Sequence, residues 1–174
     1  MDYVRYIDRT REYYAEAGFA EPYLWAHDDS SPFTRLGKPL SECRVTLITT
    51  AGFELEPEGG FSEAELAELR RGGSNVGSYD LEVFPVPSDT PEERIAYLAA
   101  NHDRAQSDMS DLNAYFPLTR LREFRDAGVL GSLAEHFYRL RENYSQRKTL
   151  ETDAPEVARR CLAEGVDVAL MVPV

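Results

Sequence analysis

The sequence predicts a single-domain α/β fold of three layers, in which helices flank both faces of an open, mainly parallel sheet. Two runs rich in β-branched and apolar residues, 44–50 and 166–174, have the composition of buried strands. The second run follows an amphipathic segment that ends at Gly165, and a helix leading into an apolar strand is half of a βαβ unit. With 174 residues, of which 43% are hydrophobic, the chain can form one such domain with a core.

The amino-terminal part is predicted to form a helix and an arm. Residues 2–17 have helical periodicity and stop at Gly18. The apolar side chains expected to pack are those of Tyr3, Tyr6, Ile7, Tyr13 and Tyr14. Residues 22–40 are interpreted as an ordered arm that wraps toward the core, because Trp25 and Phe33 are too apolar for a free linker. We therefore divide the chain into residues 1–40, helix and arm, and residues 41–174, the α/β domain.

The first predicted strand leads into a tight turn and then a short helix. Residues 44–50 end at Ala51 and Gly52, which is typical of a strand followed by a turn. Ser62 and Glu65 have the spacing of a capping box and predict the start of a helix that ends before a glycine-rich loop.

A strand and a helix are predicted next. Residues 81–86 have strand composition, and Pro85 within them indicates an edge strand. Thr90 as N-cap, with Pro91 in the first helical position, predicts a helix that runs to about Asn101.

The following region alternates between turns and a helix. Residues 111–117 are predicted as a short turn or strand that feeds a helix over residues 118–127, stopped by Gly128. Residues 129–140 are predicted as a short turn and a mixed aromatic stretch, and residues 141–152 as a loop.

The last predicted unit is a helix followed by a strand. Asp153 and Glu156 again have capping spacing, and Pro155 lies in the first turn of the helix that they open. This helix runs to Glu164, and the final apolar run is expected to be a buried strand in which the domain is truncated.

Charge and composition exclude several classes of function. The formal net charge of −12 argues against nucleic acid or an anionic membrane surface as a partner, since both would repel the chain. No stretch approaches the ~20 apolar residues of a spanning helix, and the start lacks the layout of a signal peptide. We therefore expect a cytoplasmic protein. No Gly-x-Gly-x-x-Gly follows a strand, which argues against a dinucleotide cofactor.

The cysteines and two of the histidines give little functional signal. Cys43 and Cys161 have no second cysteine at motif spacing, so neither a disulfide framework nor a metal site is predicted. Cys161 lies among apolar residues and is expected to be a small buried side chain, whereas Cys43 is left open. His27 and His136 have no supporting pattern, and we assign them no role.

The strongest candidate site residues lie where strands end. Ligands of open parallel sheets bind beyond the carboxyl ends of the strands. Thr49, Thr50, Ala51 and Gly52 follow the first strand and can present hydroxyl and backbone N–H groups to an anionic ligand. A turn that uses glycine only to reverse direction is an equally open interpretation.

Four further residues are candidates outside that turn. His102 and Asp103 form a pair in which histidine beside a carboxylate can act as general base, although a helix-end cap or surface position is the alternative. Asp111 and Asn113 can reach the ligand or hold their own turn, and for these two we favour the structural role.

Several segments carry a resemblance to a known family. The sequence from about residue 33 to the end resembles the selenoprotein B family of glycine, sarcosine, betaine and D-proline reductases. The resemblance depends on the order and spacing of five segments: Thr49-Thr50-Ala51-Gly52; Pro87-Ser88-Asp89-Thr90-Pro91; Asp111-Leu112-Asn113, leading to Phe116-Pro117-Leu118 and Arg120-Leu121; Gly128 to Gly131-Ser132-Leu133; and Gly165-Val166-Asp167 to Val172-Pro173-Val174.

The resemblance implies that the reactive residue follows Val174. In the family, the strand end that Pro173 and Val174 resemble is followed by selenocysteine or cysteine, then proline, one residue and a second cysteine. Because UGA encodes selenocysteine, a gene read by ordinary rules stops there, and we expect a selenoprotein truncated at its active residue. A shortened expression product and a degenerate paralogue are the alternatives. The resemblance also implies a thiol or small-molecule substrate, and reductase subunits or a second copy as partners.

Two functions from different classes therefore remain open. The first is a selenol- or thiol-dependent reductase that has no other cofactor in residues 1–174 and is inactive without the residue after Val174. The second is a non-catalytic α/β binding or interaction module, whose strand ends hold a small anion or a partner.

Overall fold

The computed structural model describes residues 5–19, 21, 29–30, 33–72, 83–97, 110–140 and 145–174. The chain falls into two units, Met1–Thr34 and Arg35–Val174. In the first unit, helix α1 spans Tyr6–Glu16 as predicted, and Gly18 follows it with a φ of 90°. The described side chains that were expected to pack are exposed. Tyr3 and about half of the predicted arm, residues 22–28 and 31–32, lie outside the described residues, so the division at residue 40 stays a prediction.

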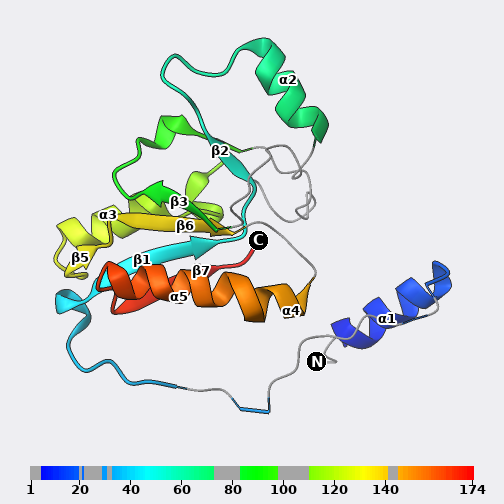
Figure 1. Cartoon of the computed structure of the whole chain (residues 1–174), viewed down its shortest axis with the longest axis horizontal. Helices are drawn as coiled ribbons and strands as arrows, with labels where there is room; N and C mark the ends of the chain where they lie inside the picture. The colour runs from blue at the N-terminus through cyan, green and yellow to red at the C-terminus, as the bar shows by residue number, and fades with distance from the viewer. Residues whose placement is uncertain are drawn as a thin grey trace. The chain divides into compact units, whose positions relative to one another are not determined.

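The second unit is built on a five-stranded sheet with β1 (Arg44–Thr49) in its interior (Figure 1). On one side, β1 pairs in parallel with β7 (Val168–Val172). On the other side it pairs in parallel with the short β5 (Ser132–Leu133) and then with β6 (His136–Leu140). β3 (Val83–Pro87) runs antiparallel to β6 at the edge. The mainly parallel sheet and the edge position of β3 are therefore confirmed.

Helices lie on both faces of this sheet and complete the three layers. Successive side chains of a strand point to opposite faces. Leu47 packs in the larger core cluster with Leu118 and Leu121 of α3 (Leu118–Asp126), which begins and ends close to its predicted bounds. Ile48 packs on the opposite face with Val157 of α5 (Ala154–Ala163). In Figure 1, α5 crosses in front of the sheet.

The predicted capping box is confirmed at helix α2 (Glu63–Gly72). The backbone N–H of Ser62 donates to Oε2 of Glu65 at 2.8 Å, and the backbone N–H of Glu65 donates to Oγ of Ser62 at 3.2 Å. The two side chains thus satisfy each other's backbone donors at the start of the helix.

The last strand is confirmed as a strand, but the prediction that it is buried is wrong. β7 is exposed over most of its length, and Leu170 and Met171 keep 40% and 67% of their surface accessible. These neighbours point to opposite faces, so both faces of the sheet are partly uncovered at this strand. Among the described strands, only β1 pairs with β7. An apolar run therefore indicated a strand here without indicating its place in the sheet.

The helix predicted after Thr90 is wrong in its described part. A 3-10 turn, η3 (Glu92–Arg94), is followed by strand β4 (Ile95–Tyr97), which pairs antiparallel with β2 (Phe53–Leu55). Ile95 and Tyr97 pack against the larger core cluster, and this burial outweighs the local helix-start signal. Residues 98–101 lie outside the described residues.

Two elements in the carboxyl-terminal third also differ from the prediction. The aromatic stretch contains β5 and β6, and the predicted loop contains a helical segment, α4 (Gln146–Lys148), capped by the side chain of Ser145. A π-helical turn, η5 (Thr149–Asp153), joins α4 to α5. α5 begins directly after Asp153 with Pro155 in its first turn, as predicted, but the Asp153 side chain makes no cap hydrogen bond, because η5 already precedes α5 as a helical turn. Pro155 has no N–H to donate to the preceding turn, which favours this irregular geometry.

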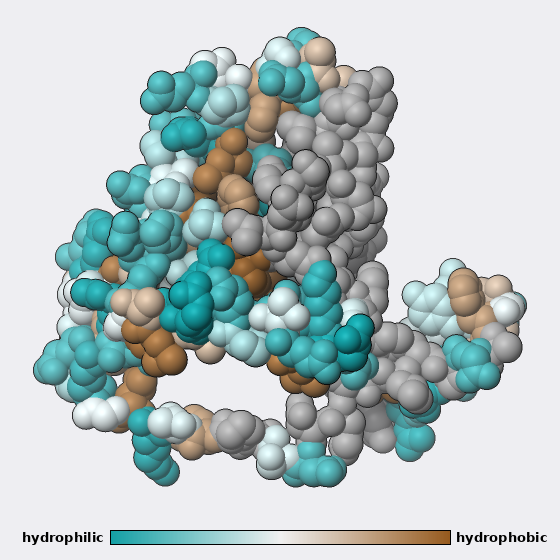
Figure 2. All heavy atoms as spheres, viewed as in Figure 1, coloured by the Kyte–Doolittle hydropathy of each residue, from teal (hydrophilic) through white to brown (hydrophobic). Residues whose placement is uncertain are grey.

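The surface agrees with the acidic composition. On the face that Figure 2 shows, most described residues of the second unit are hydrophilic, and hydrophobic residues form small patches between them. Of the helices in the described part of the chain, none has the length and apolar character needed to cross a membrane.

Candidate strand-end site

The carboxyl ends of β1 and β7 meet at Thr50. The Thr50 hydroxyl accepts a hydrogen bond from the backbone N–H of Val174 at 2.9 Å and lies 3.2 Å from the Val174 carbonyl oxygen, to which it can donate. The backbone N–H of Thr50 also donates to the Val172 carbonyl at 3.4 Å. The structure therefore brings together residues from both ends of the predicted site.

Thr49 fixes the other side of the same turn. Its hydroxyl donates to the Tyr115 carbonyl at 2.9 Å and accepts from the backbone N–H of Ala51 at 3.1 Å. Thr49 and Ala51 are both buried, and Gly52 leads from them into β2. The described contacts of both threonine hydroxyls are with backbone groups, so in this structure they hold the turn, and a ligand-binding role for Thr49, Thr50, Ala51 and Gly52 stays a prediction.

A buried ion pair that the sequence did not predict lies beside Thr49. Arg139 of β6 is the register partner of Thr49, and its Nη2 lies 3.5 Å from Oε1 of Glu54 on β2. The guanidinium carbon is 5.8 Å from the centre of the Phe53 ring and 5.2 Å from that of Phe84. The side chains of Arg139 and Glu54 are 12% and 8% exposed. The arginine thus carries positive charge into an aromatic environment next to the strand end.

Tyr115 lies among aromatic rings beside the strand end, and its hydroxyl stays protonated there. Tyr115 lies with its ring centre 4.7 Å from that of Tyr97 and 6.4 Å from that of Phe53. Burial raises the pKa of Tyr115 to about 12, so its hydroxyl stays neutral at physiological pH.

Asp111 and Asn113 hold their own turn. Oδ1 of Asp111 accepts from the backbone N–H of Asn113 at 2.9 Å, and this hydrogen bond lowers the pKa of Asp111. The side-chain oxygen of Asn113 accepts from the Thr119 hydroxyl at 2.6 Å and from the backbone N–H of Arg120 at 3.3 Å, at the start of α3. These hydrogen bonds are of the kind expected if Asp111 and Asn113 hold their own turn, and ligand binding by either residue stays a prediction. His102 and Asp103 lie outside the described residues.

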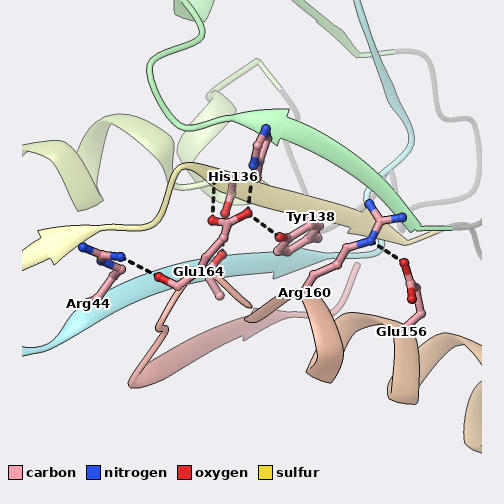
Figure 3. Close-up of polar contacts among 7 residues, drawn as sticks. Arg44, His136, Tyr138, Glu156, Arg160 and Glu164 are labelled. Atoms are coloured by element: carbon pink, nitrogen blue, oxygen red, sulfur yellow. Dashed lines mark hydrogen bonds and ion pairs between the residues drawn. The ribbon is translucent and has the colours of Figure 1, made fainter. Parts of the chain in front are cut away.

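His136, to which the sequence assigned no role, belongs to a polar cluster at the opposite end of the sheet (Figure 3). Its Nδ1 lies 2.8 Å from Oε1 of Glu164, and its backbone N–H donates to Oε2 of the same carboxylate at 3.0 Å. The Tyr138 hydroxyl donates to Oε1 at 2.9 Å. Glu164 therefore joins the end of α5 to the start of β6.

The electrostatics of this cluster follow from its partial burial. Burial acts to raise the pKa of Glu164, but the hydrogen bonds from His136 and Tyr138 outweigh it, and the pKa lies below its ordinary value. Burial, followed by the hydrogen bond to Glu164, raises the pKa of Tyr138. The carboxylate is thus ionised and the phenol neutral, which suits a structural acceptor with two donors.

The two cysteines have no features of nucleophiles. Cys43 is fully buried, and its Sγ lies 3.3 Å from the Pro39 carbonyl oxygen. Cys161 is partly buried against the smaller core cluster, and burial raises the pKa of its thiol. A raised pKa lowers the fraction of reactive thiolate. In the described part of the chain, there is no group of three or more His, Cys, Asp or Glu side chains that could hold a metal ion.

Comparison with known proteins supports a distant relationship to reductase subunits. The chain is 24% identical over 134 residues to the glycine reductase complex component B subunit gamma of Peptoclostridium acidaminophilum, covering 77% of this chain and 28% of that protein. It is 24% identical over 140 residues to the D-proline reductase subunit gamma of Acetoanaerobium sticklandii, covering 80% of this chain and 52% of that protein. The chain thus spans about half or less of these curated relatives. No family model matches, and no solved structure matches.

Proposed function

We propose that the chain provides the strand-end scaffold of a selenol- or thiol-dependent reductase, with the reactive selenocysteine or cysteine directly after Val174. The observation that carries the proposal is the double hydrogen bond of Thr50 to Val174, which fixes the backbone at the carboxyl ends of two adjacent parallel strands. The distant similarity to subunits of glycine reductase and D-proline reductase supports the reaction class.

The proposed chemistry is a two-electron redox cycle. A selenolate or an acidified thiolate at the strand end acts as the nucleophile, and a cysteine three positions further on acts as the resolving thiol. The pair gives two electrons to an oxidised small-molecule substrate, or to the disulfide form of a thiol substrate, which takes up two protons, and the pair ends as a selenenyl sulfide or disulfide. An external dithiol then reduces the pair again. Such a cycle needs a reducing compartment, so we place the protein in the cytoplasm, with other reductase subunits as partners.

The gene and the intact protein test this proposal together. The codons after position 174 are sequenced, and the gene is expressed with selenium supplied to the cells. We expect UGA or a cysteine codon followed by codons for Pro-x-Cys, and, for UGA, an intact mass that includes selenium. An ordinary stop codon without such a downstream frame would contradict the reductase.

The exposed apolar side chains of β7 and of Val174, which follows it, favour a second candidate. Leu170, Met171 and Val174 keep 40%, 67% and 44% of their surface accessible, as expected where another polypeptide segment packs. A non-catalytic interaction module is therefore the function that remains if the gene carries no redox residue after Val174.

A further inference from the structure

We infer that Thr50 is a positioning residue: its hydroxyl holds the backbone of Val174 and thereby sets the reactivity of the group that follows Val174. The inference rests on the proposed function for the identity of that group. Thr50 does not contact the reactive residue itself; it contacts the backbone of Val174, the residue that precedes the reactive one.

The β1–β7 ladder ends just before Thr50 and Val174. The last paired residues of the two strands are Thr49 and Val172. The Val172 carbonyl accepts from the backbone N–H of Thr50, so Val172 and Val174 face β1, and Pro173, which has no N–H group, faces away from it. The next backbone donor on that strand is Val174, and its N–H is bound by the Thr50 side chain rather than by backbone. The Thr50 hydroxyl therefore continues the pairing where the ladder itself stops.

The Thr50 hydroxyl contacts two backbone groups of Val174. A hydroxyl has one donor and two acceptor sites, and Thr50 places it against both the N–H and the carbonyl of one residue, at 2.9 and 3.2 Å. Two contacts to the same residue restrict its backbone rotation more than one contact does. Because the next side chain departs from that backbone, its direction relative to the surrounding N–H groups depends on Thr50.

The contacts of Thr50 with Val174 contribute to local position more than to the stability of the fold. The hydrogen bonds of Thr50 to Val174 are solvent-exposed, whereas Thr49 of the same turn is buried and bonded to a buried carbonyl. Exposed hydrogen bonds exchange readily with water and contribute little to global stability. Local order at Val174 is therefore the main consequence of the Thr50 hydroxyl.

The test compares three variants of the full-length gene product. Thr50→Val removes the hydroxyl and keeps the shape, and Thr50→Ser keeps the hydroxyl. Thr46→Val is the control, because Thr46 lies in β1, the strand that Thr50 follows, and its hydroxyl also donates to a backbone carbonyl, that of His136 at 2.8 Å. The readouts are amide hydrogen exchange at Val174 and the rate constant for iodoacetamide alkylation of the group after Val174.

For Thr50→Val we expect faster exchange at Val174 and, because the displaced selenolate or thiolate loses stabilising contacts with the strand-end N–H groups, alkylation that is slower by about tenfold. Thr50→Ser and Thr46→Val are expected to stay within about twofold of the natural protein in both readouts. An unchanged alkylation rate in folded Thr50→Val would overturn the inference. If the gene has neither selenocysteine nor cysteine after Val174, the proposed function fails, and a cysteine placed there by mutation still tests Thr50 by the same rates.

Discussion

The two ends of β1 are built from different chemistry. At its amino end, charged groups bind one another and the backbone: Oδ2 of Asp167 accepts from the backbone N–H of Arg44 and from Nζ of Lys38, both at 2.7 Å. Glu164 also reaches this end, because its carbonyl oxygen accepts from Nη1 of Arg44. At its carboxyl end, the hydroxyls of Thr49 and Thr50 bind backbone groups. Ionic contacts therefore hold the amino end together, whereas short neutral side chains shape the end at which we place the chemistry.

Arg139 and Glu54 place a buried ion pair close to the carboxyl end of β1, so the comparison of the two ends includes one charged contact there. Removing the arginine in Arg139→Leu leaves the Glu54 carboxylate buried without its cation, and we expect a loss of unfolding free energy of about 3 kcal/mol. Denaturant unfolding followed by circular dichroism measures this loss. The double variant Arg139→Leu with Glu54→Leu should recover part of it, and a double variant less stable than Arg139→Leu would count against the ion pair.

Removing a hydrogen-bond acceptor at the amino end should cause the next largest loss of unfolding free energy. Glu164→Ala removes the acceptor of the His136 backbone N–H and of the Tyr138 hydroxyl, both partly or fully buried, and we expect a loss of about 2 kcal/mol. The unfolding midpoint in urea measures it. Glu156→Ala is the matched control on the same helix, because the contacts of Glu156 are with the side chains of Arg159 and Arg160. Equal losses in the two variants would contradict a special role of Glu164.

The amino end should also respond to acid. The pKa of Asp167 is lowered chiefly by the hydrogen bond from the Arg44 backbone N–H, and that of Glu164 is also below its ordinary value of 4.5. A carboxyl whose pKa is lower in the folded than in the unfolded state stabilises the fold above its ordinary pKa. Stability should therefore be constant near neutral pH and fall as the pH drops below about 4.5. Glu164→Gln should reduce the slope of the unfolding midpoint against pH, and an unchanged slope would exclude Glu164 as a contributor.

Thr50→Val should have the smallest effect on stability. Its exposed hydrogen bonds to Val174 contribute about 0.5 to 1 kcal/mol, so the urea midpoint should shift only slightly. A shift as large as that of Glu164→Ala would mean that the carboxyl end is a structural clamp, which would remove the contrast between the two ends.

The parts of the fold with simple local patterns could be predicted from the sequence. β1, α3 and the capping box at Ser62 follow from apolar periodicity and cap spacing, and the turn at Thr49 and Thr50 was identified from its position after a strand. β6 was missed because His136 and Arg139 interrupt its apolar pattern, and both are satisfied by partners distant in sequence. The helix predicted after Thr90 failed for a similar reason, since its residues pair with β2.

The candidate site was likewise predictable only in part. Strand ends can be located from an apolar run and a following turn, and this placed Thr50 and Val174 at one edge. The pairing of Arg139 with Glu54 and of His136 with Glu164 requires the register of β6 against its neighbours, which no local pattern specifies. The exposure of β7 depends in the same way on which strands surround it.

One rate constant tests most directly whether the amino end of β1 is structural while its carboxyl end positions the reactive group. Alkylation of the group after Val174 is measured for Thr50→Val and Glu164→Ala at roughly pH 6, under conditions in which both variants are folded. The account predicts that Thr50→Val slows this reaction by about tenfold while Glu164→Ala, although less stable, keeps the natural rate. Equal rates in the two variants, or a slower reaction in Glu164→Ala alone, would contradict the account.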